Sequence, residues 1–238
     1  MKGKRAIVTG ASRGIGAAIS CALAEHGVDL VLTGRDGDAL AQVARKASAN
    51  GVNVGTVRAD LTDPAAPGSI VAEAVGILGG LDYLINNAGV AGSKPFADTS
   101  LEDWETHIAV NARAPFFLCQ RALPYLAEST SPSIINIASV VATKGYENQS
   151  AYSASKHALL GFTKAMAKEL QSLGIRVHTV SPGGVATELV TAVRPDIDPS
   201  DLIQPEDVAD IVIFLLASGR SGMIDEILVR RSGKTPWL

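Results

Sequence analysis

One short stretch of the sequence indicates the fold most clearly: Thr9-Gly10-Ala11-Ser12-Arg13-Gly14-Ile15-Gly16. The stretch directly follows an apolar run at residues 5–9 and opens an apolar pattern of helical period at residues 15–26. Glycine suits positions where the backbone turns sharply or must approach a pyrophosphate closely. The helix that follows would offer free N–H groups and the positive end of its dipole to an anion. We therefore expect a strand, a glycine-rich turn and a helix that together bind the phosphates of a dinucleotide.

Apolar runs and helical patterns alternate along the rest of the chain. We predict strands at residues 5–9, 28–33, 52–58, 81–86, 133–139, 175–181 and 224–229, and helices at residues 15–26, 38–49, 65–78, 101–126, 150–173 and 205–217. The strands are continuous apolar runs, as expected when helices cover both faces of a sheet. This pattern predicts an α/β fold, a single Rossmann-type doubly wound parallel sheet of about seven strands. We expect residues 1–238 to form one dinucleotide-binding and catalytic domain, with the irregular stretch 188–204 as a candidate lid.

Composition narrows the functional classes. The 238 residues are 47% hydrophobic, which is enough for a large core, yet no apolar run reaches the roughly 18 residues that span a bilayer. We read no signal peptide at the N-terminus and expect a cytoplasmic protein with no membrane partner. The net charge of −3 comes without a basic stripe, so we expect no nucleic-acid partner. We expect Cys21 and Cys119 to be buried reduced thiols, and the sequence has no Cys/His spacing typical of a metal site.

The end of the second predicted strand discriminates between the two nicotinamide dinucleotides. An NAD site usually has an acidic residue there for the ribose hydroxyls. Here Gly34 holds that position and Arg35 follows, while Arg13 lies in the glycine turn. Two guanidinium groups would suit a 2′-phosphate, which favours NADP(H) over NAD(H). Two alternatives stay open: Asp36 could reach the ribose, or both arginines could simply be solvated.

A proton-transfer pair is suggested by Tyr152 and Lys156, four residues apart in a predicted helix and so on one face. A tyrosine hydroxyl has an ordinary pKa of about 10, and a nearby ammonium is expected to lower it. Such a tyrosine can exchange a proton with a substrate hydroxyl or carbonyl. Ser139 follows the apolar run 134–138, where a strand would deliver it to the same site. On its own, the pair could equally be an ordinary surface pair.

Together, these motifs resemble those of the short-chain dehydrogenase/reductase family, over nearly the whole chain. Gly10, Gly14, Ile15 and Gly16 look like its cofactor turn, and Asp60-Leu61 like its adenine-contacting pair. Asn86-Asn87-Ala88-Gly89 resembles the motif that follows the family's fourth strand. Ser181-Pro182-Gly183, with Val185 and Thr187, resembles the family's segment beside the nicotinamide. A catalytic tetrad is matched by Asn111, Ser139, Tyr152 and Lys156. Overall the chain looks like the oxoacyl-carrier-protein-reductase-like branch.

The resemblance implies a role for each position. Tyr152 would give or take the proton, Ser139 would hydrogen-bond the substrate oxygen, and Lys156 would lower the tyrosine pKa and bind the nicotinamide ribose. Asn111 would hold a water that resupplies protons. The cofactor is expected to contact Gly10, Ser12, Arg13, Gly14, Ile15, Gly16, Arg35, Asp60, Leu61, Asn87, Ala88, Gly89, Tyr152, Lys156, Pro182, Gly183, Val185 and Thr187. The substrate pocket is expected to be flanked by Ser139, Val141, Tyr146, Gln149, Gly183 and Leu189.

The implied function is hydride transfer between NADP(H) and a small-molecule carbonyl or secondary alcohol, as in a 3-oxoacyl-type or other ketone reductase. The alternatives are an NAD-linked sugar, polyol or alcohol dehydrogenase and a non-catalytic NADPH-binding sensor. The apolar faces of helices 101–126 and 150–173 and the resemblance imply a homodimer or homotetramer. One departure is the C-terminal end, where a basic segment containing Arg230, Arg231 and Lys234 and ending near Trp237 replaces the family's glycine-rich turn.

Overall fold

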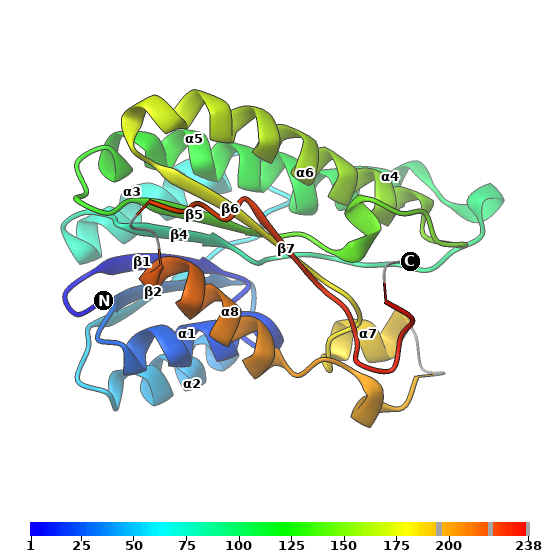
Figure 1. Ribbon diagram of the computed structural model, residues 1–238, viewed down its shortest axis with the longest axis horizontal. Helices are drawn as coiled ribbons and strands as arrows, with labels where there is room; N and C mark the ends of the chain where they lie inside the picture. The colour runs from blue at the N-terminus through cyan, green and yellow to red at the C-terminus, as the bar shows by residue number, and fades with distance from the viewer. Residues whose placement is uncertain (194–196, 219–220, 237–238) are drawn as a thin grey trace.

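A computed structural model of the chain describes residues 1–193, 197–218 and 221–236 (Figure 1). Seven parallel strands form one sheet in the order β3-β2-β1-β4-β5-β6-β7. The strands are β1 (Arg5–Thr9), β2 (Asp29–Gly34), β3 (Val54–Arg58), β4 (Tyr83–Asn86), β5 (Ser133–Ile137), β6 (Arg176–Pro182) and β7 (Glu226–Val229). The predicted doubly wound parallel sheet is therefore confirmed, and each strand boundary lies within two residues of its expected position.

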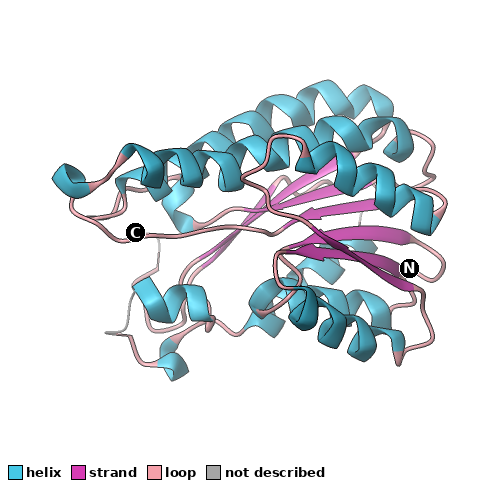
Figure 2. Ribbon diagram, turned by 180° about the vertical axis from the view of Figure 1, so that it is seen from behind, coloured by secondary structure: helices cyan, strands magenta, loops and turns pink. Residues whose placement is uncertain are grey.

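Helices cover both faces of this sheet (Figures 1 and 2). One face carries α1 (Gly14–Glu25), α2 (Gly37–Ser48) and α8 (Pro205–Ala217), and the other carries α3 (Ala66–Leu78), α5 (Ala114–Leu126) and α6 (Ser150–Leu170). The helix α4 (Leu101–Ile108) leads into α5 and packs beside α6, and the short α7 (Glu188–Val193) follows β6.

Two hydrophobic cores lie on opposite sides of the sheet. Ile19, Leu23 and Leu215 belong to the core under α1 and α8, whereas Ile70 and Leu118 belong to the core under α3 and α5. All five side chains are fully buried. Burial of each such side chain stabilises the fold by roughly 1.5–3 kcal/mol relative to exposure in water. The continuous apolar strands thus hold a rigid sheet whose carboxyl ends position the loops.

The order of the strands reverses between β1 and β4. The connection from β1 leads through α1 to β2 on one side, whereas β4 lies on the other side of β1. The loops that leave the carboxyl ends of these two strands therefore diverge, and ligands of such sheets bind in the crevice between them. The glycine-rich turn lies at this crevice.

Some elements differ from the sequence prediction. The predicted helix 101–126 contains a π-helical turn at Ala109–Arg113 between α4 and α5. The predicted helix 150–173 is α6 followed by a 3₁₀ turn at Gln171–Leu173. The stretch 188–204, expected to be irregular, contains α7 and a 3₁₀ turn at Pro199–Asp201, and its residues 194–196 lie outside the described part of the chain.

The segment after β7 folds back on itself. The Arg230 guanidinium donates hydrogen bonds to the carbonyl oxygens of Arg231, Ser232 and Lys234 at 3.0, 3.0 and 2.7 Å. Three carbonyls held by one side chain give the basic segment a compact shape beside α7 (Figure 1). Trp237, near the end of this basic segment, lies outside the described residues.

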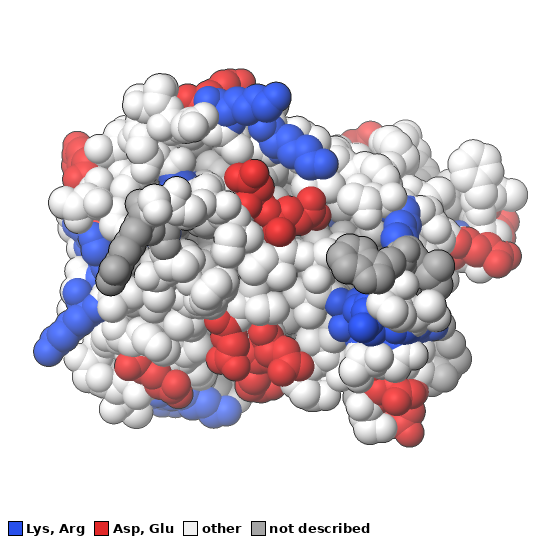
Figure 3. All heavy atoms as spheres, in the orientation of Figure 1, with Lys and Arg blue, Asp and Glu red and all other residues white. Residues whose placement is uncertain are grey.

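The surface carries mixed charge on the face shown in Figure 3, where basic and acidic side chains gather in several separate small groups. Within the described ranges, the helices are too short or too polar to cross a membrane.

Candidate active site

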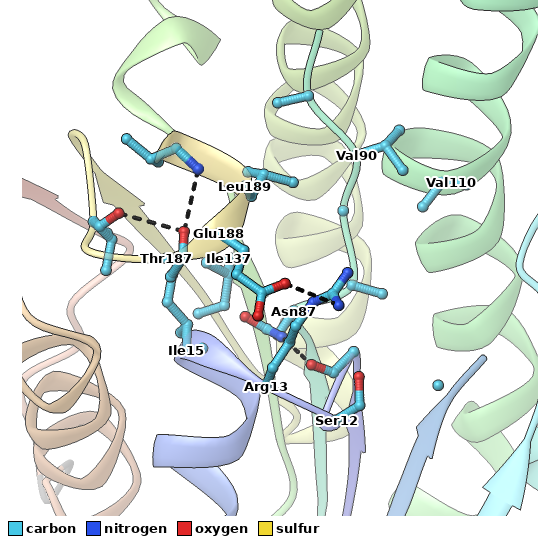
Figure 4. Close-up of a pocket in the computed structure, with 18 of the residues that line it drawn as sticks. Ser12, Arg13, Ile15, Asn87, Val90, Val110, Ile137, Thr187, Glu188 and Leu189 are labelled. Atoms are coloured by element: carbon cyan, nitrogen blue, oxygen red, sulfur yellow. Dashed lines mark hydrogen bonds and ion pairs between the residues drawn. The ribbon is translucent and has the colours of Figure 1, made fainter. Parts of the chain in front are cut away.

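A cavity of about 1060 Å³ opens at the carboxyl ends of the strands. Its wall combines the glycine turn, the ends of β2 to β6, the first turns of α6 and the start of α7 (Figure 4). Of the expected cofactor and catalytic residues, the wall contains Gly10, Ser12, Arg13, Gly14, Ile15, Arg35, Asp60, Leu61, Asn87, Ala88, Gly89, Ser139, Tyr152, Lys156, Pro182, Gly183, Val185 and Thr187. Segments far apart in sequence therefore meet at one cavity, which is large enough for a dinucleotide.

The glycine turn is tightly packed against the loop after β4. Gly10 has a φ of +64°, and a Cβ atom built there would lie 2.7 Å from the Cα atom of Ala88. A Cβ atom on Gly16 would collide with the carbonyl oxygen of Gly10. The Asn87 amide donates to the carbonyl oxygens of Thr9 and Gly10 at 2.9 and 3.1 Å. Any larger residue at these two glycines would push the turn away from its place.

The N-terminus of α1 faces this cavity. Within the described residues, no side chain caps this helix end, and its first turn contains no acidic residue. The first N–H groups of a helix have no partner inside the helix, so they attract anions. Together with the glycines, this uncapped end fits the pyrophosphate of a dinucleotide.

Beyond β2, the two candidate ribose-binding residues differ in their contacts. Asp36 is the N-cap of α2, and its carboxylate accepts a hydrogen bond from the Ala39 backbone at 3.0 Å. Arg35 lines the cavity, and its carbonyl oxygen accepts a hydrogen bond from the Arg58 guanidinium at 3.0 Å. Asp36 is thus engaged in capping, whereas a second arginine buttresses the backbone of Arg35. Sequence reasoning missed Arg58. The pairing of β2 with β3, in which Gly34 lies opposite Arg58, is the feature that brings Arg58 to this place.

The loop after β3 is held in shape by its own polar groups. Asp60 accepts hydrogen bonds from the Thr62 backbone and hydroxyl, each at 2.9 Å, and the backbone bond is the main reason that the pKa of Asp60 is lowered. The Arg113 guanidinium donates to the Thr62 carbonyl oxygen at 2.6 Å. Arg113 belongs to the π-helical turn, so this contact joins the Asp60 loop to the helix that carries Asn111. Sequence reasoning also missed Arg113.

Ser139, Tyr152 and Lys156 meet at the inner end of the cavity. Ser139 follows β5, while Tyr152 and Lys156 lie one turn apart near the start of α6. Lys156 is only 4% exposed, and its ammonium nitrogen donates to the Ile137 carbonyl oxygen at 2.9 Å. Burial lowers the pKa of Lys156 to about 8. The site thus contains an amine whose ordinary pKa is strongly perturbed, as is common in functional sites.

The pKa of Tyr152 lies above its ordinary value in this structure, not below it as the sequence led us to expect. Burial raises the pKa of the Tyr152 hydroxyl, and a hydrogen bond with Ser139 offsets only part of this rise. The physical reason is that desolvation disfavours the phenolate, while the nitrogen of Lys156 is directed to the Ile137 carbonyl. Tyr152 is therefore a protonated phenol at neutral pH, able to donate a proton.

Asn111 lies behind this group and outside the cavity wall. Its amide nitrogen donates to the Val90 carbonyl at 2.8 Å and to the Ser155 hydroxyl at 2.9 Å, and its amide oxygen accepts from the Val90 backbone at 2.9 Å. Ser155 in turn donates to the Tyr152 carbonyl at 2.7 Å. Both amide hydrogens of the side chain expected to hold a water are thus engaged with the protein, whereas the amide oxygen accepts one hydrogen bond and keeps a second lone pair.

The expected substrate residues are divided by the structure. Leu189 and Gly183 line the cavity, as does Ser139. Val141 is buried and Tyr146 is 45% exposed, and these two residues and Gln149 lie outside the described cavity wall. Gly16, which was expected to contact the cofactor, also lies outside this wall. The wall includes residues that sequence reasoning did not select, among them Thr33, Val90, Val110, Glu188 and Val190. The positions of Val110, Glu188 and Val190 depend on how α4, α5 and α7 pack, which local sequence does not reveal.

Arg13 differs most from its expected place. Instead of turning toward the end of β2, its guanidinium forms an ion pair with Glu188 of α7, with 3.0 Å between nitrogen and oxygen (Figure 4).

In the described ranges, no group of three or more His, Cys, Asp or Glu side chains is arranged to hold a metal ion.

Comparison with known proteins gives the same family over almost the whole chain. A family profile described as short chain dehydrogenase matches residues 4–198. The chain is 34% identical to the 3-oxoacyl-[acyl-carrier-protein] reductase FabG of Aquifex aeolicus, with 96% of each chain covered. It is 33% identical to a metagenomic short-chain oxidoreductase crystallised with NADP, with a TM-score of 0.85 and coverage of 98% and 99%. It is 34% identical to a short chain dehydrogenase from Burkholderia cenocepacia in complex with NADP, with a TM-score of 0.88 and coverage of 96% and 97%. On its sequence, its fold and these relatives, the chain belongs to the short chain dehydrogenase family of oxidoreductases.

Proposed function

We propose that this protein is an NADP(H)-dependent oxidoreductase that reduces a ketone, of 3-oxoacyl or other type, to a secondary alcohol or catalyses the reverse reaction. The observation that carries the proposal is that one cavity joins an uncapped helix N-terminus and glycine turn to Ser139, Tyr152 and Lys156. The first part suits a dinucleotide, and the second part suits a substrate oxygen.

The choice of NADP(H) rests on the residues beyond β2. Arg35 lines the cavity with its backbone buttressed by Arg58, while the carboxylate of Asp36 accepts a backbone hydrogen bond as a helix cap. A guanidinium suits a phosphate through charge-assisted hydrogen bonds, and a capping carboxylate is less free for ribose hydroxyls. Two relatives crystallised with NADP support the same choice.

In the proposed chemistry, NADPH when bound would supply the hydride that adds to the carbonyl carbon. Tyr152 donates its hydroxyl proton to the carbonyl oxygen, so that one C–H and one O–H bond form. Ser139 hydrogen-bonds the same oxygen and stabilises the negative charge that develops on it. Lys156 lies one turn away on α6, where its ammonium compensates the phenolate that remains on Tyr152.

The raised pKa of Tyr152 and the lowered pKa of Lys156 fit this direction of reaction. A phenol that keeps its proton at neutral pH is ready to donate it, and the nearby amine with a pKa of about 8 can resupply one. The protein therefore begins with the acid form that ketone reduction needs. The opposite direction would need a base, which requires a higher pH.

We also propose that the protein works as a homodimer or homotetramer. Phe116 and Phe117 of α5 are 44% and 39% exposed, and the ring of Phe116 meets Phe162 of α6 with 5.4 Å between centroids. Exposed aromatic rings that cluster on two neighbouring helices are costly in water. A second copy that packs against α5 and α6 would remove this cost.

The proposal is tested by following NADPH absorbance with purified protein and a panel of ketones, diketones and 3-oxoacyl thioesters. We expect oxidation of NADPH with at least one ketone class and clearly slower turnover with NADH. Tight NADPH binding without turnover across the whole panel would instead support a non-catalytic sensor. Faster turnover with NADH, on sugars or polyols, would support an NAD-linked dehydrogenase.

A further inference from the structure

An ion pair in the cavity wall joins the glycine turn to the start of α7. Arg13 belongs to the glycine turn, and Glu188 is the first residue of α7. The two side chains point toward each other, with 3.0 Å between their charged atoms (Figure 4). The residues beside them also pack together, because a Cβ atom on Gly14 would lie 2.9 Å from the methyl carbon of the Thr187 side chain. The start of α7 is thus held against the glycine turn.

Glu188 differs from the other carboxylates of the cavity wall. Asp36 accepts a hydrogen bond from the Ala39 backbone, and Asp60 accepts hydrogen bonds from Thr62. Both carboxylates are therefore occupied by local donors that hold a helix end or a loop in shape. Among the ion pairs of the described residues, that of Glu188 is the one whose cation also lines the cavity. Its carboxylate thus pairs with a cation that an anionic ligand in the cavity would also attract.

We propose that Glu188 is a cofactor-specificity residue, an internal carboxylate that competes with the 2′-phosphate of NADP(H) for the guanidinium of Arg13. This inference rests on the proposed NADP(H) role of the cavity. A carboxylate and a phosphate use the same planar donors of a guanidinium, so each contact made with Glu188 is lost to the phosphate. NAD(H) lacks this phosphate and gains nothing when Arg13 is released. Glu188 therefore reduces the preference for NADP(H) below what Arg13 alone would give.

The expected size of this effect is small and measurable. The Arg13 and Glu188 side chains are 64% and 76% exposed, so water screens their attraction. Exposed ion pairs change equilibria by about 1.5-fold to 5-fold in double-mutant cycles. Competition of this strength would tune the affinity for NADPH without preventing its binding. It would also release α7 from the glycine turn when the phosphate takes Arg13.

The test is a double-mutant cycle on dissociation constants for NADPH and NADH, measured by titration calorimetry on the full chain. The proteins are the wild type, Glu188→Gln, Arg13→Gln and the double variant. We expect Glu188→Gln to bind NADPH about 2-fold to 5-fold more tightly and NADH with unchanged affinity. In the Arg13→Gln background, the same change at Glu188 should have no effect. Glu206→Gln, an exposed glutamate on α8 outside the cavity wall, is the matched control and should leave both constants unchanged.

Several outcomes would overturn the inference. An equal gain for both cofactors, or a gain that persists without Arg13, would mean that Glu188 acts only by its general charge. Unchanged or weaker NADPH binding in Glu188→Gln would mean that the carboxylate does not compete or that it orients Arg13 for the phosphate. A wild type with no preference for NADPH over NADH would instead contradict the proposed cofactor, whatever the variants do.

Discussion

Lys156 shows at the scale of one residue how the fold changes the chemistry of a side chain. The amine is buried, and one carbonyl oxygen, that of Ile137, accepts its hydrogen bond. Burial in a poorly solvating interior favours the uncharged form of an amine. The sequence predicted that Lys156 would act on Tyr152, but it could not predict how deeply the fold would bury the Lys156 amine. Burial depends on packing from β5 and from the π-helical turn, which are distant in sequence.

The lowered pKa of Lys156 predicts how the stability of the protein without cofactor depends on pH. The folded state has a pKa of about 8 against an ordinary value of 10.5, so between these values the unfolded chain binds more protons. The free energy of unfolding contributed by this group therefore rises with pH, by up to about 2 kcal/mol between about pH 7 and 9.5. Urea unfolding of the wild type and Lys156→Met should show this rise in the wild type alone. Lys164→Met, at an exposed lysine of the same helix, should behave like the wild type, and parallel curves for all three would contradict the prediction.

Arg35 carries the proposed preference between cofactors. Its guanidinium would pair with the 2′-phosphate, an interaction that NADH cannot make. We expect Arg35→Ala to weaken NADPH binding by about tenfold to a hundredfold and to leave NADH binding almost unchanged. Fluorescence titration measures both constants. The control is Arg45→Ala, at an exposed arginine near the end of α2, and equal losses for both cofactors in Arg35→Ala would argue against a phosphate contact.

At the scale of elements, the sequence predicted the strands well and the interruptions of helices poorly. The strands are apolar runs between polar residues, so their ends are visible in the sequence. The π-helical turn at Ala109–Arg113 lies inside the predicted helix 101–126, and no residue in it marks a departure from α-helical geometry. Within this turn Asn111 hydrogen-bonds the Val90 loop and Ser155, and these partners approach only in the folded protein. The helix α7 was missed for a different reason: it has only six residues, and prolines follow it closely in the sequence.

Asn111 should therefore matter for stability as well as for the site. Its replacement by alanine would leave the Val90 N–H and carbonyl without their side-chain partner and would remove the donor to the Ser155 hydroxyl. We expect Asn111→Ala to lower the free energy of unfolding by about 2–4 kcal/mol. Asn50→Ala, at an exposed asparagine with one hydrogen bond to Ala47, should cost less than about 1 kcal/mol. Similar losses in urea unfolding for both variants would show that the Asn111 network contributes little.

At the scale of the whole molecule, the exposed aromatic cluster predicts self-association. The sequence indicated extra apolar surface on two helices, but the cluster is visible only once α5 and α6 lie side by side. We expect Phe116→Glu to dissociate the assembly into smaller species because a carboxylate would be buried at the contact. Light scattering after size exclusion measures the mass. Ile77→Glu, at a 52% exposed residue of α3, should keep the wild-type mass, and an assembly unaffected by Phe116→Glu would place the contact elsewhere.

The proposed chemistry as a whole depends on the Tyr152 hydroxyl, so one variant tests it most directly. Tyr152→Phe removes that hydroxyl and keeps the ring that packs 6.2 Å from His107, so the fold and the cofactor cavity should persist. NADPH binding and NADPH-dependent ketone reduction are to be measured on the same preparations of wild type and variant. We predict a dissociation constant for NADPH within about twofold of the wild type and a kcat lowered by at least about a hundredfold. Ketone reduction at the wild-type rate by Tyr152→Phe would contradict the proposed role of this site.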